Sequence, residues 1–194
     1  MPKTKTYRVE LDEMLAAEYH YIAQTAVQAN EDRARVSSFY LIAVGSLVAA
    51  LFGTQFFEPQ FFSSTVKLMF SGLFVLLTLL GVSTVMQLAR LRAAWYESML
   101  AMNQLKDFVM ERDRDLASAF RWKTSTLPPK YKVNSISFYQ TLEVAMISGL
   151  MFGAAIFFLQ QVFFRVSVWT WTVSAVAGLL VLFLQLTIYK RVLK

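Results

Sequence analysis

Four long apolar runs, at residues 37–57, 66–88, 139–164 and 168–189, constrain this chain more than any other feature of its sequence. A helix needs roughly 20 apolar residues to cross about 30 Å of hydrocarbon, and each run is that long. Hydrophobic residues make up 56% of the chain and charged residues only 16%, against about 25% charged in an ordinary soluble domain. We therefore expect an all-α integral membrane protein with four transmembrane helices.

The basic residues predict the orientation of these helices. Seventeen of the 19 Lys and Arg residues lie in segments that would share one side: five in 1–36, nine in 89–138 and three after 189. Because cytoplasmic segments carry an excess of Lys and Arg, we expect both termini in the cytoplasm of a bacterium, with the protein in its inner membrane. Four arginines next to the spans would anchor the chain at lipid headgroups: Arg33, Arg35, Arg90 and Arg92.

The first two spans are expected to continue as helices into the cytoplasm. No Pro or Gly interrupts residues 11–36, and their apolar positions follow helical spacing, which predicts one helix from about residue 10 to 57. The second helix should run to about Lys123, because Pro128 and Pro129 follow. The chain then divides into a cytoplasmic amphipathic helix (1–36), a transmembrane hairpin (37–88), a cytoplasmic helix with a Pro-containing connector (89–138), and a second transmembrane hairpin with a short basic tail (139–194).

The two cytoplasmic helices should pack together as a long antiparallel hairpin. Such a hairpin would leave a free apolar face, made of Trp95, Met99, Met102 and Phe120. Burial of that face against copies of the same chain predicts a homo-oligomer, and a cytoplasmic protein partner or signalling ligand is the alternative.

Small residues recur at four-residue steps within the spans, which allows helices to approach closely in lipid. Gly45 and Ala49 form one such pair, and Ala145, Gly149 and Gly153 form a longer series in the third span. Packing within one chain and contact between copies both remain open.

Polar residues inside the spans are the candidate functional set. Glu143 lies about one turn inside the third span, and a carboxylate there is expensive without water or a partner. Gln87 and Gln185 lie at similar depth, and Gln160 lies toward the other side of the membrane. These residues could line a water-filled axis between copies, or they could serve ordinary structural hydrogen bonding near the headgroups.

Enzymatic chemistry finds little support in this sequence. The chain has no cysteine and a single histidine, His20, so it cannot build a thiolate metal site or a catalytic triad by itself. No phosphate-binding loop or metalloprotease motif occurs. We expect no cofactor, no metal and no nucleic-acid partner. The lipid bilayer is the expected environment.

Two stretches, EYHYIAQ at residues 18–24 and NEDRARVSSFYL at residues 30–41, resemble a bacterial group of small membrane proteins. These are the SLATT and RipA-like proteins, in which long cytoplasmic helices feed into spans. The likeness is architectural and covers roughly residues 10–120. It implies an oligomeric, pore-forming or membrane-perturbing effector of the kind proposed to act in phage defence.

The sequence thus favours a non-enzymatic, homo-oligomeric membrane protein that forms a channel or perturbs the bilayer under the control of its cytoplasmic helices. The alternative is a non-conducting scaffold or accessory subunit that docks a cytoplasmic or membrane partner.

Overall fold

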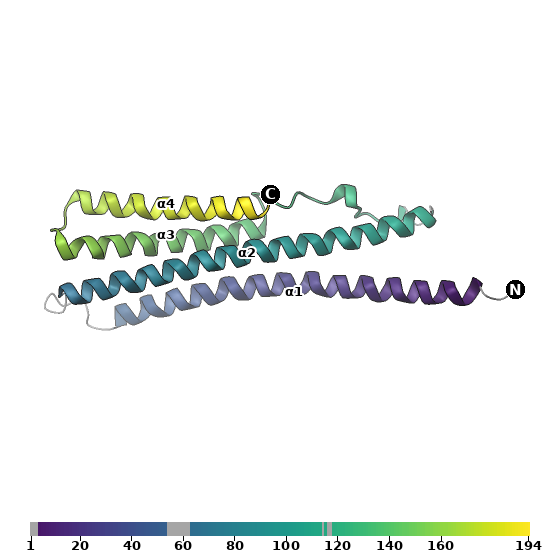
Figure 1. The fold of residues 1–194 in the computed structure, drawn as a ribbon, viewed down its shortest axis with the longest axis horizontal. Helices are drawn as coiled ribbons and strands as arrows, with labels where there is room; N and C mark the ends of the chain where they lie inside the picture. The colour runs from purple at the N-terminus through teal and green to yellow at the C-terminus, as the bar shows by residue number, and fades with distance from the viewer. Residues whose placement is uncertain (1–3, 54–62, 114, 116–117) are drawn as a thin grey trace. The chain divides into compact units, whose positions relative to one another are not determined.

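The computed structural model describes residues 4–53, 63–113, 115 and 118–194 (Figure 1). Throughout these residues the regular structure is helical: α1 (Thr4–Gly53), α2 (Ser64–Arg112), α3 (Ile136–Phe163) and α4 (Val168–Val192), with a 3-10 turn at Thr124–Thr126. All four α-helices are long and apolar enough to cross a membrane. The expectation of an all-α chain with four such helices is therefore confirmed.

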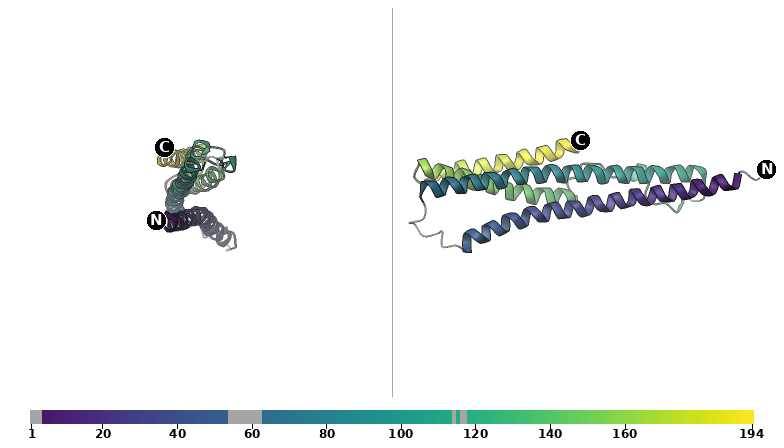
Figure 2. Two further views of the ribbon diagram at one scale, coloured as in Figure 1. Left: turned by 90° about the vertical axis from the view of Figure 1, so that its right-hand side faces the viewer. Right: turned by 60° about the horizontal axis from the view of Figure 1, so that its bottom comes forward.

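The chain forms two compact units, and helices α1 and α2 each contribute to both. The extension unit consists of Met1–Arg33 and Leu91–Lys132, and the span unit consists of Ala34–Arg90 and Val133–Lys194. The span unit holds all of α3 and α4, which lie side by side in every view (Figures 1 and 2).

Short polar motifs lie at the starts of α3 and α4. The Ser135 hydroxyl accepts a hydrogen bond from the Phe138 N–H, which satisfies one of the free donors at the start of α3. At the start of α4 the Thr170 hydroxyl accepts from the Ser167 N–H at 3.0 Å. These caps explain why the two helices begin at Ile136 and Val168.

Helix α1 begins earlier than the sequence pattern predicted. It starts at Thr4 and not near residue 10, and no Pro or Gly lies between Thr4 and Asp12 to interrupt the helix. The expected end near residue 57, together with residues 54–57 of the first predicted span, lies outside the described residues.

Helix α2 ends earlier than predicted, at Arg112 and not near Lys123. The Asp113 carboxylate accepts a hydrogen bond from the Asp115 N–H at 3.1 Å. Such a local side-chain bond competes with the next turn of helix, and a carboxylate is also unfavourable at the negative end of the helix dipole. The prolines at 128 and 129 are therefore not what stops this helix.

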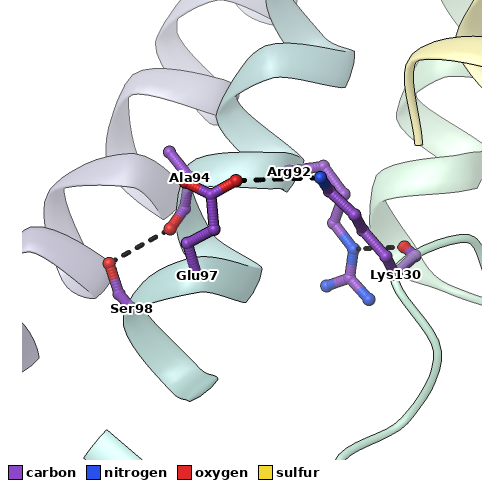
Figure 3. Close-up of polar contacts among 5 residues, drawn as sticks. All are labelled: Arg92, Ala94, Glu97, Ser98 and Lys130. Atoms are coloured by element: carbon purple, nitrogen blue, oxygen red, sulfur yellow. Dashed lines mark hydrogen bonds and ion pairs between the residues drawn. The ribbon is translucent and has the colours of Figure 1, made fainter. Parts of the chain in front are cut away.

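Past this point, the connector runs back along α2 within the extension unit. The Asn103 side chain donates to the Lys123 carbonyl at 3.2 Å, and the Asp107 carboxylate accepts from the Thr124 N–H at 3.3 Å. Further along, Arg92 Nε donates to the Lys130 carbonyl at 3.3 Å, and Lys130 Nζ lies 3.7 Å from Glu97 (Figure 3). Side chains of α2 thus hold both ends of the returning segment.

Candidate functional site

The span unit places large apolar side chains outside and small or polar ones inside. Leu150 is 68% exposed and Leu180 is 65% exposed, whereas Ser148 and Gln185 are fully buried. In the most apolar stretch of each candidate span, at most 39% of the residues are buried inside the chain. In water this distribution would expose an extensive apolar surface, so it favours an exterior that contacts hydrocarbon.

Four buried polar side chains and one buried glycine make up what we call the polar centre: Tyr40 of α1, Thr78 and Gly81 of α2, Ser148 of α3 and Gln185 of α4. The Ser148 hydroxyl is its hub. This hydroxyl donates to the Thr78 carbonyl at 3.2 Å and accepts from Gln185 Nε2 at 2.6 Å. The polar centre therefore joins α2, α3 and α4 by side-chain hydrogen bonds.

Gly81 allows the helices to meet at the polar centre. A Cβ atom at this position would lie 2.5 Å from the Ser148 hydroxyl oxygen and 2.8 Å from the Tyr40 hydroxyl oxygen. Both distances are too short for any side chain, so only glycine permits α1 and α3 to approach α2 here. Helices α1, α2 and α3 consequently meet around one glycine, and α4 is joined to them through the hydrogen bond from Gln185 to Ser148.

Two buried polar atoms of the centre lack good hydrogen bonds. Gln185 Oε1 accepts no hydrogen bond from any described residue. The Tyr40 hydroxyl faces Ser148 without hydrogen-bond geometry. Unsatisfied buried groups are costly, so the centre is held together less firmly than its burial alone suggests.

A second close approach joins α3 to α4. A Cβ atom on Gly149 would lie 2.7 Å from the Gly178 carbonyl oxygen, and one on Gly153 would lie 3.0 Å from the Ser174 carbonyl oxygen. Gln160 Nε2 crosses the same seam, at 3.2 Å from the Ser174 hydroxyl. The small residues of α3 therefore pack within the chain.

The other small residues singled out from the sequence differ in their surroundings. Ala145 is fully buried, as the α3 series would require. By contrast, no atom lies within 4 Å of a Cβ position on Gly45, and Ala49 is exposed. The pair on α1 thus has no close neighbour among the described residues.

The four polar residues proposed from sequence do not form one site. Gln185 and Gln160 are used inside the unit, in the polar centre and the α3–α4 seam. Glu143 and Gln87 are exposed on the outer faces of α3 and α2, where Gln87 Nε2 lies 3.3 Å from the Ser83 hydroxyl. A polar path through the interior of one chain is not evident from these positions.

The expected free face of the extension unit is largely covered by the chain itself. Met102 is buried, and Trp95, Met99 and Phe120 are partly buried. Phe120, from the returning segment, lines an apolar pocket of about 330 Å³ together with Leu15, Tyr19, Leu105, Lys106 and Val109. Phe120 therefore lies in the returning segment and not on α2, where the predicted end of the helix near Lys123 would have placed it.

Two of the four predicted headgroup arginines are buried in the extension unit. Arg33 donates to Asn30 Oδ1 at 2.8 Å, and Arg92 stacks on the Trp95 ring with its guanidinium carbon 4.3 Å from the ring centroid. Arg35 and Arg90 are exposed. Direct contact with headgroups therefore suits Arg35 and Arg90 and does not suit the other pair.

Known proteins provide no further guidance to this site. No protein-family model, curated protein or solved structure matches the chain. Among the described residues no group of three or more His, Cys, Asp or Glu side chains could hold a metal ion. The polar centre and the outward polar residues are therefore interpreted from their geometry alone.

Proposed function

We propose that this chain is a non-enzymatic membrane protein that assembles with copies of itself and conducts ions or perturbs the bilayer. Its span unit would lie in the membrane of a bacterium, with the extension unit in the cytoplasm. A change in the extension unit would reach the membrane through α1 and α2, which contribute residues to both units.

The polar centre is the observation that carries this proposal. Tyr40 and Gly81 belong to α1 and α2, the helices shared with the extension unit, and they contact Ser148 of α3. The Ser148 hydroxyl in turn accepts a hydrogen bond from Gln185 of α4. A shift of either long helix would therefore disturb α3 and α4 at a tightly packed point where two buried polar atoms, Tyr40 Oη and Gln185 Oε1, accept no hydrogen bond from the described residues.

A conducting path in this proposal runs between copies. The polar side chains inside the span unit are largely committed to each other, and glycine contacts close the α3–α4 seam. The outward faces carry the remaining polar groups, including Glu143 and Gln87. The likeness of residues 18–41 to SLATT and RipA-like proteins supports an effector role of this kind.

A non-conducting scaffold is the second candidate, and the apolar pocket of the extension unit favours it. Leu105, Val109 and Phe120 give this pocket an apolar wall, and Lys106 adds one cation. In that case a partner would dock on the extension unit, and the span unit would serve only as the anchor.

Potassium release from vesicles that contain the purified protein separates the two candidates. Gly81→Ala inserts a methyl group between the Tyr40 and Ser148 hydroxyls, so we expect it to change the release rate several-fold from wild type. Gly72→Ala is the matched control, because no atom lies within 4 Å of its Cβ position. If neither wild type nor Gly81→Ala releases potassium faster than protein-free vesicles, the scaffold is favoured.

A further inference from the structure

The outer face of α3 carries an isolated carboxylate. Glu143 is exposed and makes no hydrogen bond or ion pair with any described residue. Three of its neighbours along the same helical face have large exposed rings or apolar chains, Tyr139 at 53%, Met146 at 49% and Leu150 at 68%, and the half-buried Gln140 is the polar neighbour. A charged group among such residues is expensive in a membrane, and it calls for a polar partner from outside the chain.

Hydrogen bonds between α2 and α3 fix the depth of this carboxylate. The Thr78 and Ser148 side chains each bond the other residue's carbonyl, at 3.5 and 3.2 Å, so these residues are level. The two helices run antiparallel (Figure 1). Glu143 precedes Ser148 by five residues and is therefore level with Ser83, five residues after Thr78.

The outer face of α2 holds complementary groups near that depth. Gln87 and Arg90 are both exposed, and they follow Ser83 along the helix axis by roughly 6 Å and roughly 10 Å. Side chains lean toward the N-terminus of their own helix, so Arg90 leans toward the level of Glu143 while Glu143 leans toward Arg90. Within one chain Glu143 reaches neither of them.

We propose that Glu143 of one copy docks on the α2 face of a second copy, where the Gln87 amide and the Arg90 guanidinium receive its carboxylate. This inference rests on the self-assembly in the proposed function. Because the α3 face and the α2 face are different surfaces, the contact is heterologous, and repetition of it builds a closed ring or an open chain.

Charge reversal tests the contact in the full-length protein. Two differently tagged copies are expressed together, and the amount of one recovered with the other is measured. We expect Glu143→Arg alone and Arg90→Glu alone each to lower the recovery about tenfold or more, because each leaves like charges facing one another. Both changes in the same chain should restore recovery. Arg191→Glu, on an exposed position of α4, is the matched control and should leave it unchanged.

The outcomes separate this inference from the broader proposal. If wild-type copies are not recovered together, self-assembly and this contact both fail. If wild-type copies are recovered together but Glu143→Arg has no effect, or the double reversal does not restore recovery, only the contact is overturned.

A disulfide test does not depend on charge-reversed variants folding. The chain has no cysteine, so when a copy with Glu143→Cys is oxidised beside a differently tagged copy with Gln87→Cys, a cross-linked pair that carries both tags can contain only the bond between positions 143 and 87. We expect a cross-linked pair that carries both tags. Replacing the first variant with Leu180→Cys, on the exposed face of α4, should abolish the cross-link. Cross-linking that is absent for the first pair, or equal for both, would overturn the contact.

Discussion

At the scale of single residues, Gly178 determines how closely α3 and α4 can pack. A Cβ atom there would lie 2.6 Å from the Gly149 carbonyl oxygen, which belongs to the backbone and cannot rotate away. Gly45, on α1, has no atom within 4 Å of the same position. An added methyl group should therefore disturb packing at Gly178 and leave packing unchanged at Gly45.

We expect Gly178→Ala to destabilise the folded protein by about 1–3 kcal/mol, because the helices must separate to admit the methyl group. Gly45→Ala should be neutral or slightly stabilising, because alanine favours a helix. Thermal unfolding in detergent, followed by the loss of helical circular dichroism, measures both. Equal midpoints for Gly178→Ala and wild type would show that the seam is not tightly packed.

The sequence identified part of this residue-level structure. Four-residue spacing pointed to Gly149 and Gly153 as packing positions, and it left their partners open. Serine and threonine hydroxyls of the polar centre, such as Ser148 and Thr78, were missed, because in a single sequence a hydroxyl that bonds across helices looks the same as one that bonds its own backbone. Both kinds of bond occur at Thr78.

At the scale of elements, the end of α2 and the returning segment depend on side-chain bonds. Asp107 accepts the Thr124 N–H, and the neighbouring Asn103 donates to the Lys123 carbonyl. Asp107 is thus a partly buried acceptor for the backbone of the connector.

Removing the Asp107 carboxylate should loosen the segment that returns along α2. We expect Asp107→Ala to raise hydrogen exchange of the Thr124 amide about fivefold, the equivalent of about 1 kcal/mol for one hydrogen bond. Asp107→Asn keeps an acceptor oxygen and should exchange more slowly than Asp107→Ala. Gln104→Ala, at an exposed position on the same helix, should match wild type. Unchanged exchange in Asp107→Ala would contradict the assigned bond.

The long helices were predictable and their ends were not. Twenty-residue apolar runs and the absence of breakers are strong signals that act over many residues. The end of α2 depends on one bond between Asp113 and the Asp115 backbone, and no proline or glycine marks it. The competition between such a side-chain bond and one further helical turn is decided by small energies, which the spacing of apolar residues in the sequence does not reveal.

At the scale of the whole molecule, the hydrophobic composition and the uneven distribution of Lys and Arg were the basis of the predicted four-span topology. The number of apolar helices followed directly from the length of the runs, whereas the close approach of α1 and α3 to Gly81 of α2 depends on contacts between residues far apart in the chain. On the outward faces of the span unit, Glu143 lies beside exposed apolar side chains. We expect these faces to meet lipid or other copies, with the two ends of the span unit on opposite sides of a membrane.

Labelling of engineered cysteines in bacterial cells stripped of their outer membrane tests this transmembrane arrangement. The chain has no cysteine of its own, and three exposed positions sample the expected compartments: Gln104, Val166 and Leu180. A membrane-impermeant maleimide needs a thiolate in water. We predict that Val166→Cys is labelled in intact cells, that Gln104→Cys is labelled only after lysis, and that Leu180→Cys is labelled in neither. Labelling of Leu180→Cys from water, or of Val166→Cys and Gln104→Cys from the same side, would show that the span unit does not cross the membrane as proposed.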